Sequence, residues 1–259
     1  MKSNLQYWLV DHPTILHFTW TEGETPASTL LFLTLALLTY LSLTLLLTRL
    51  PLPPLNLKPI SALHNLTLLL LSLTMALGCT LSILSSPSST LCFSPTTTTP
   101  TGPLFFWAYV FYLSKLLEFL DTLLIILTRS LHRLSFLHVY HHATVLLMCY
   151  LWLHTRQSLF PVALVTNACV HVLMYAYYFL CAVGIRPRWK RAVTDCQIVQ
   201  FVFSFAVSGR MLYLHFSGSG CSGIWGWCFN AVFNASLLAL FLDFHGKSYA
   251  SRNPKDKRS

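Results

Sequence analysis

The chain has 259 residues, of which 54% are hydrophobic and only 10% are charged. Soluble globular domains carry about 25% charged residues, so this composition excludes an ordinary soluble protein and favours a membrane protein. The net charge of +9 would also suit a nucleic-acid-binding protein. The cations, however, are distributed as a membrane topology signal and not as a basic patch, so we expect membrane lipid as a partner and no nucleic acid.

Runs of about 20 apolar residues, the length of a helix that crosses a bilayer, recur along the chain. They predict a single all-α domain over residues 1–259 with seven spans, at residues 28–47, 62–84, 104–127, 136–153, 160–183, 192–214 and 224–242. The first run lies far from the N-terminus and follows an acidic segment, so we expect it to be kept as an anchor and not cleaved as a signal peptide. This run has no ionisable residue, which predicts a peripheral helix.

The lysines and arginines fall mainly in alternate connections between the spans. One side holds Arg49, Lys58, Arg129, Arg133, Arg186, Arg188, Lys190, Arg191 and the basic tail at residues 243–259. By the positive-inside rule this side is cytosolic, which predicts a lumenal N-terminus and a cytosolic C-terminus. The tail carries Lys255 and Lys257 at the spacing of a dilysine retrieval signal. The predicted location is therefore the endoplasmic reticulum membrane.

Cys92 and Cys221 stand apart from the other cysteines, because they fall in the lumenal connections after the second and sixth predicted spans. The lumen of the endoplasmic reticulum permits disulfides. We therefore predict a disulfide between these two residues.

Ionisable side chains gather in the third and fourth spans. Lys115, Glu118 and Asp121 follow one stripe of the third span, either as an interhelical salt-bridge ladder or with one carboxylate orienting an imidazole and Lys115 balancing the charge. The fourth span carries three histidines whose spacing places them on one helical face: His138, His141 and His142. Three imidazoles at membrane depth favour a functional site over simple packing.

The fifth and sixth spans add polar groups at the same predicted depth. Asn167, His171, Met174 and Tyr178 share a face of the fifth span, and the sixth span carries Gln197 and Gln200. Amides within a membrane span seldom face lipid. The pattern therefore predicts a pocket that opens toward the cytosol, with apolar depth beyond it.

Four motifs occur in order: Lys-x-x-Glu-x-x-Asp at residues 115–121, His-x-x-His-His at 138–142, Asn-x-x-x-His-x-x-Met-Tyr-x-Tyr-Tyr at 167–178 and Thr-x-x-Gln-x-x-Gln at 194–200. With these motifs the chain resembles the elongation-of-very-long-chain-fatty-acids family, over roughly residues 104–215. The resemblance implies six spans in an inverted barrel around an acyl tunnel. It also implies condensation of long-chain acyl-CoA with malonyl-CoA to 3-oxoacyl-CoA, CO₂ and CoA, with no metal and no tightly bound cofactor.

The expected chemistry assigns roles to these residues. His141 first, or His171 second, would accept the acyl group as an acyl-imidazole. Hydrogen bonds to the thioester oxygen, on which negative charge develops, would come from Asn167, Gln197, His142 or His138. Asp121 or Glu118 would orient an imidazole. The CoA phosphates would meet Arg186, Arg188, Lys190 and Arg191. Further substrate contacts would come from Tyr175, Tyr178 and Gln200.

The expected partners are the 3-ketoacyl-CoA reductase, the dehydratase and the enoyl reductase that complete the elongation cycle. Two rival interpretations remain open at this stage. An iron-dependent desaturase or hydroxylase also uses His-x-x-His-His boxes, but its two-iron site needs about eight histidines, more than share one predicted depth here. A seven-span receptor or transporter has the same topology, but such a function does not explain why the polar motifs of four spans lie at the same membrane depth.

Overall fold

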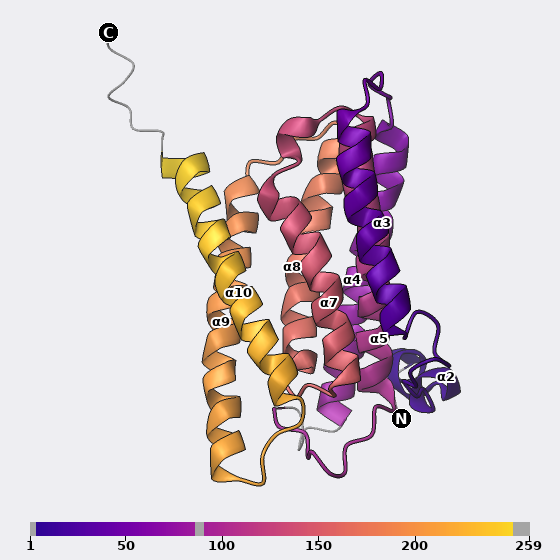
Figure 1. The fold of residues 1–259 in the computed structure, drawn as a ribbon, viewed down its shortest axis with the longest axis vertical. Coiled ribbons are helices and arrows are strands. Elements are labelled where there is room, and N and C mark those ends of the chain that lie inside the picture. Colours follow the sequence, from indigo (N-terminus) through magenta and orange to yellow (C-terminus); the bar gives the residue numbers. More distant parts are fainter. Residues whose placement is uncertain (1–3, 86–90, 251–259) are drawn as a thin grey trace.

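The computed structural model describes residues 4–85 and 91–250, and within these ranges the chain is helical, with no β-strand (Figure 1). The long helices are α3 (Leu30–Arg49), α4 (Lys58–Ser85), α5 (Pro103–Leu117), α6 (Phe119–Leu127), α7 (Phe136–His154), α8 (Phe160–Ala182), α9 (Lys190–Ser217) and α10 (Ile224–His245). The short helical segments are α1 (Asn4–Gln6), η1 (Tyr7–Asp11), α2 (Pro13–Leu16), η3 (Leu131–Arg133) and η4 (Gly246–Ala250).

Within the described ranges, six helices are long and apolar enough to cross a membrane: α3, α4, α7, α8, α9 and α10. They make the chain a multi-pass membrane protein. Their bounds differ by only a few residues from the predicted spans, because long apolar runs are the strongest signal in a sequence of this kind.

The third predicted span is the exception, because the structure divides it at Glu118 into α5 and α6. The two helices together cover the predicted span at residues 104–127, but the sequence did not predict the interruption. The backbone N–H of Asp121 donates to the carbonyl of Glu118 three residues earlier, which tightens the helix locally. The Ser114 hydroxyl also donates to the carbonyl of Phe111, a bond that often bends helices. The break therefore lies inside the Lys115–Asp121 motif.

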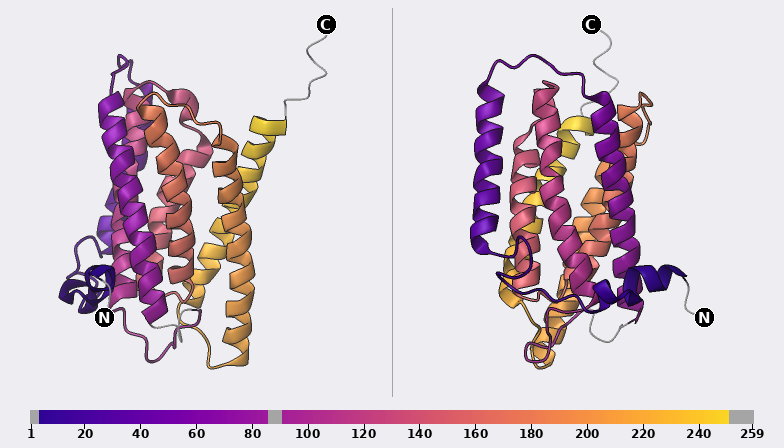
Figure 2. Two further views of the ribbon diagram at one scale, coloured as in Figure 1. Left: turned by 180° about the vertical axis from the view of Figure 1, so that it is seen from behind. Right: turned by 90° about the vertical axis from the view of Figure 1, so that its right-hand side faces the viewer.

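Successive long segments alternate in direction, so their connections gather at two ends of the bundle (Figures 1 and 2). The α3–α4, α6–α7 and α8–α9 connections share one end, which we call the cationic end. Its described cations include Arg49, Lys58, Arg129, Arg133, Arg186, Arg188, Lys190, Arg191 and Lys247. The α4–α5, α7–α8 and α9–α10 connections share the opposite end.

Helix α3 lies on the outside of the bundle, where it contacts α6 and α7 (Figure 2). Most of its side chains are exposed, and Tyr40 is one of the two that are buried. The Tyr40 ring stacks on Phe119 with 4.0 Å between centroids. The remaining helices follow one another in a closed succession of neighbours, α4, α5, α7, α10, α9, α8 and back to α4.

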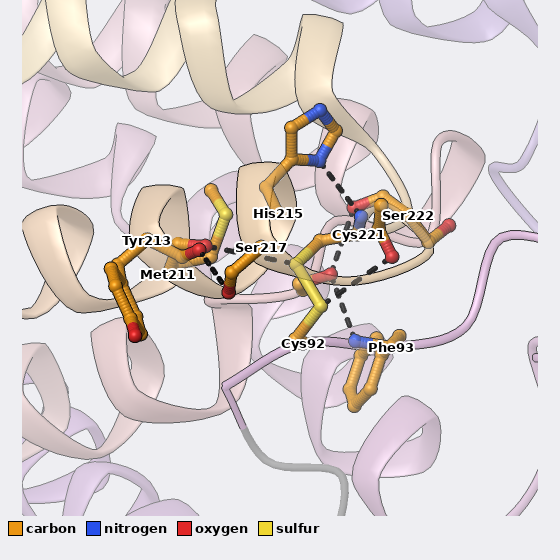
Figure 3. Close-up of a disulfide and its surroundings, with 10 residues drawn as sticks. Cys92, Phe93, Met211, Tyr213, His215, Ser217, Cys221 and Ser222 are labelled. Atoms are coloured by element: carbon orange, nitrogen blue, oxygen red, sulfur yellow. Dashed lines mark hydrogen bonds between the residues drawn. A yellow bond between two sulfur atoms is a disulfide. The ribbon is translucent and has the colours of Figure 1, made fainter.

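A disulfide joins Cys92 to Cys221 at the end opposite the cationic end, with 4.9 Å between the Cα atoms (Figure 3). The predicted pairing is confirmed. Hydrogen bonds tie the same segments together: the Ser222 N–H donates to the Phe93 carbonyl at 2.8 Å, and the Cys221 N–H donates to His215 Nδ1 at 2.8 Å. The segment before α5 is thus fixed to the α9–α10 connection.

Candidate active site

A buried ion pair at the α5–α6 junction forms the centre of the polar region. Lys115 and Glu118 are each 1% exposed, and the Lys115 ammonium donates to Glu118 Oε1 at 2.6 Å. His171 on α8 lies beside both groups, with its Nδ1 atom 3.3 Å from Glu118 Oε1 and 3.5 Å from Lys115 Nζ. Glu118, and not Asp121, is therefore the carboxylate beside His171, and Nδ1 can either accept from the Lys115 ammonium or donate toward Glu118, depending on the tautomer.

Asp121 is held by two other side chains. Its Oδ1 lies 2.9 Å from His64 Nε2, and its Oδ2 accepts a hydrogen bond from the Tyr175 hydroxyl at 2.9 Å. The second predicted span starts at residue 62, only two residues before His64, but α4 begins at Lys58 and carries His64 into the bundle. The Lys58-Pro59 pair, typical of a helix start, is the signal that could have found this earlier beginning.

The three histidines of α7 form a contiguous group. Ser135 caps the helix by accepting a hydrogen bond from the backbone N–H of His138. The Nε2 atom of the His138 ring is hydrogen-bonded to the Thr122 hydroxyl at 2.8 Å. His142 is 7% exposed, with its ring centroid 4.4 Å from that of His138 and 5.5 Å from that of His141. The predicted common face is therefore occupied by imidazoles in mutual contact.

The histidine group retains unused hydrogen-bonding capacity. Within residues 4–85 and 91–250, His141 Nδ1, His142 Nδ1 and Glu118 Oε2 are buried without a hydrogen-bond partner. Buried polar atoms are almost always paired in proteins, and unpaired ones call for an explanation. A substrate or a water molecule supplied from a cavity is such an explanation.

A small cavity lies beside His141 among α7, α8, α9 and α10, with about 30 Å³ available to the centres of water molecules. Its polar lining consists of His141, Thr166, Asn167, Gln200, Ser204, Asn230 and Asn234. Its apolar lining includes Val145, Met148, Trp152 and Phe233. The amides of α10 were not singled out in the sequence, because no motif marks them and their role depends on how α10 packs.

Other predicted site residues lie outside this group. Gln197 donates to the sulfur of Met174 at 3.7 Å, and Tyr178 is 44% exposed with its ring against Tyr175 and Tyr177. The basic residues of the α8–α9 connection are exposed: Arg186, Arg188, Lys190 and Arg191. Lys255 and Lys257 lie outside the described residues.

Cys149 on α7 and Cys169 on α8, which share their helices with the histidines, do not line the cavity. Cys169 is exposed, and Cys149 is buried but is not among the lining residues. The imidazole among the lining residues is that of His141.

Comparison with known proteins supports the resemblance. The sequence model of the ELO family, described as the GNS1/SUR4 family, matches residues 25–257. "Fatty acid elongase A" of Dictyostelium discoideum is 33% identical over 260 residues, covering 95% of this chain and 93% of that protein.

Two further relatives carry similar names. "Fatty acid elongase 3-like" of Arabidopsis thaliana is 30% identical over 271 residues, covering 96% of this chain and 93% of that protein. "Very long chain fatty acid elongase 5" of Xenopus laevis is 36% identical over 165 residues, covering 59% of this chain and 51% of that protein. The chain belongs to the ELO family.

Proposed function

We propose that the chain is the condensing enzyme of fatty-acid elongation, which joins a long-chain acyl-CoA to malonyl-CoA and releases 3-oxoacyl-CoA, CO₂ and CoA. The observation that carries the proposal is that two imidazoles, of the buried His171 and the partly buried His141, have different surroundings. His171 lies against the Lys115–Glu118 ion pair, whereas His141 has an unpartnered Nδ1 and faces a cavity lined with amides. The family and the names of its members support the same reaction.

The membrane arrangement is part of the proposal. Helices α5 and α6 together would cross the bilayer as one broken span, which brings the number of spans to seven. The closed succession of α4, α5–α6, α7, α10, α9 and α8 supports a barrel of six spans around an acyl tunnel, with α3 outside. We place the cationic end in the cytosol and the disulfide in the lumen of the endoplasmic reticulum.

The first chemical step transfers the acyl group to the enzyme. An imidazole nitrogen, of His141 first and of His171 second, attacks the thioester carbonyl and displaces the CoA thiolate. The N–H proton of the ring passes to the thiolate, which leaves a neutral acyl-imidazole and CoA. Such an intermediate hydrolyses readily, so it needs a site that excludes water. The burial of the His171 ring and of the Nδ1 atom of His141 supports this route.

The second step forms the new carbon–carbon bond. Malonyl-CoA loses CO₂, the resulting enolate attacks the acyl carbonyl, and the imidazole leaves with its electron pair. Negative charge develops on oxygen in both steps, and Asn167, His142 or His138 can donate hydrogen bonds to it. Glu118 stabilises the positive charge that His171 acquires if it takes a proton.

The proposal also covers the binding of the CoA moieties and the enzymes that act on the product. The exposed basic residues of the α8–α9 connection suit the CoA phosphates: Arg186, Arg188, Lys190 and Arg191. The 3-oxoacyl-CoA product requires reduction, dehydration and a second reduction before another round. We therefore propose the corresponding reductases and dehydratase as functional partners in the same membrane.

A microsomal assay with radiolabelled malonyl-CoA tests the proposal. Wild type should incorporate label into 3-oxoacyl products, and His141→Ala or His171→Ala should lower the rate by at least about 100-fold, as for loss of a catalytic acid–base or nucleophile. His132→Ala, in the η3 turn, is the matched control and should retain activity. No incorporation by folded wild type with any acyl-CoA would overturn the proposed reaction.

Mass spectrometry separates the covalent route from its alternative. Incubation with acyl-CoA alone should release CoA and leave an acyl group on His141 or His171. If neither occurs while elongation proceeds, the acyl group is not stored on the enzyme. A direct attack, with histidine as general base, would then replace the covalent route.

A further inference from the structure

The amides in the cavity are an unusual lining for a site that holds a hydrocarbon chain. Asn230 on α10 is 3% exposed, lines the cavity, and its Oδ1 atom has no hydrogen-bond partner within the described parts of the chain. A methylene group placed against this oxygen would leave it unpaired, which is unfavourable in a buried site. Nothing in the proposed chemistry uses Asn230.

The neighbouring amide has a different environment. Asn234, one turn further along α10, donates from Nδ2 to the Ser204 hydroxyl at 3.1 Å and so joins α10 to α9. A structural role explains Asn234. Asn230 lies on the same side of the helix but has no such bond, so its polar group remains available to a ligand.

The position of Asn230 indicates which part of the acyl chain it would meet. Phe233 on α10 stacks on the His141 ring with 6.4 Å between centroids. Helices α7 and α10 run in opposite directions (Figure 1), so Asn230 lies on the far side of Phe233 from the cationic end. Three residues of helix correspond to about 4.5 Å, which an extended chain covers in roughly four carbons.

The chemistry of the amide selects the ligand group. An unpaired carbonyl oxygen needs a donor, and an amide turned by 180° would instead need an acceptor. A hydroxyl group serves either orientation, whereas a ketone serves only the turned amide and a double bond serves neither. A charged amine would carry a large desolvation cost in this cavity.

We propose that this elongase accepts acyl-CoA chains with a hydroxyl group on one of the carbons near the thioester, and that Asn230 forms the hydrogen bond that recognises it. This inference rests on the proposed condensing function and names a substrate class for it. In the alternative, a water molecule forms the hydrogen bond with Asn230, and the site has no preference for a hydroxylated chain.

Substrate competition tests the inference in the full-length protein without any mutation. Three acyl-CoAs of equal length are compared by malonyl-CoA incorporation: an unsubstituted chain, a chain with a hydroxyl near the thioester, and a chain with a hydroxyl at its methyl end. We expect kcat/KM for the chain hydroxylated near the thioester to exceed the other two by about tenfold, the effect of one hydrogen bond to a buried group. Equal kcat/KM values would overturn the inference.

A substitution then assigns the effect to one residue. Asn230→Leu, which has a similar shape, should abolish the preference and preserve or raise kcat/KM for the unsubstituted chain. A purely structural role would lower all three values together and would contradict the inference. The matched control is Asn65→Leu on α4, a buried amide that bonds its own helix at Ser61 and should leave the preference intact.

The two proposals fail in different ways. Incorporation with the unsubstituted chain but no hydroxyl preference overturns the substrate class alone. Absence of incorporation with all three chains overturns the condensing function.

Discussion

Two layers of the bundle are built from the same helices but have opposite chemistry. The polar layer contains the Lys115–Glu118 pair with His141, His142 and His171. The apolar layer lies toward the disulfide end and contains stacked or edge-to-face aromatic rings: Phe93, Phe105, Phe111, Trp152 and Phe160. Helices α5, α7 and α8 contribute to both.

The difference indicates that the apolar layer stabilises the bundle and that the polar layer serves its function. In the apolar layer Phe105 and Phe160 meet with 5.1 Å between centroids, and Phe111 and Trp152 stack at 5.6 Å, which are favourable aromatic distances. In the polar layer several buried atoms have no partner among the described residues. Within the described ranges Trp152 Nε1 in the apolar layer also lacks a partner, but the unpaired atoms of ionisable side chains, on Glu118, His141 and His142, lie in the polar layer, which therefore points to chemistry.

The largest expected effect comes from Glu118→Gln. It leaves the Lys115 charge buried without its partner, which costs about 4 kcal/mol when one half of a buried pair is removed. Thermal unfolding in detergent and malonyl-CoA incorporation should both fall sharply. The double variant Lys115→Met with Glu118→Gln should regain most of the stability but not the activity. Recovery of activity in the double variant would show that the ion pair serves packing alone.

Phe160→Ala should destabilise by about 3 kcal/mol, because it removes a fully buried ring from the apolar layer and leaves a cavity. Activity per folded molecule, measured at low temperature, should stay near wild type. A loss of activity much larger than the loss of folded protein would mean that the two layers are not separable.

Removal of the disulfide should have a slightly smaller effect. The cross-link joins positions 129 residues apart, and its loss in Cys92→Ser should cost about 2 to 3 kcal/mol. The melting temperature of wild type should fall on reduction to that of the variant. Cys228→Ser, which removes a free cysteine of α10, is the control and should keep the reductant-sensitive transition.

The smallest effect concerns the contact between α4 and α5. A Cβ atom on Gly78 would lie 2.1 Å from Trp107 Cε2, so Gly78→Ala forces the indole to move and should cost about 1 to 2 kcal/mol. Gly209→Ala on α9 is the matched control, because no atom lies within 4 Å of its added Cβ. It should be neutral or stabilising, since alanine favours helix more than glycine does.

Sequence patterns predicted the helical class and most helix bounds, and they identified the polar residues of α5 to α9. They did not predict the break at Glu118, which depends on backbone hydrogen bonds that apolar composition does not reveal. They also missed His64 and Asn230, because a single polar residue in an apolar helix has no periodic signal. The choice of Glu118 over Asp121 as the partner of His171 required the helix packing.

Local chemistry was therefore readable from the chain: apolar runs of membrane length, histidines spaced on one face, and two cysteines in connections on one side. Those features depend on spacing along one helix and on the cost of placing polar groups in lipid. Which imidazole meets a carboxylate, which faces a cavity, and which amide keeps an unpaired oxygen depend on distances between helices. Such distances arise from the packing of side chains far apart in the sequence, so only the folded bundle defines them.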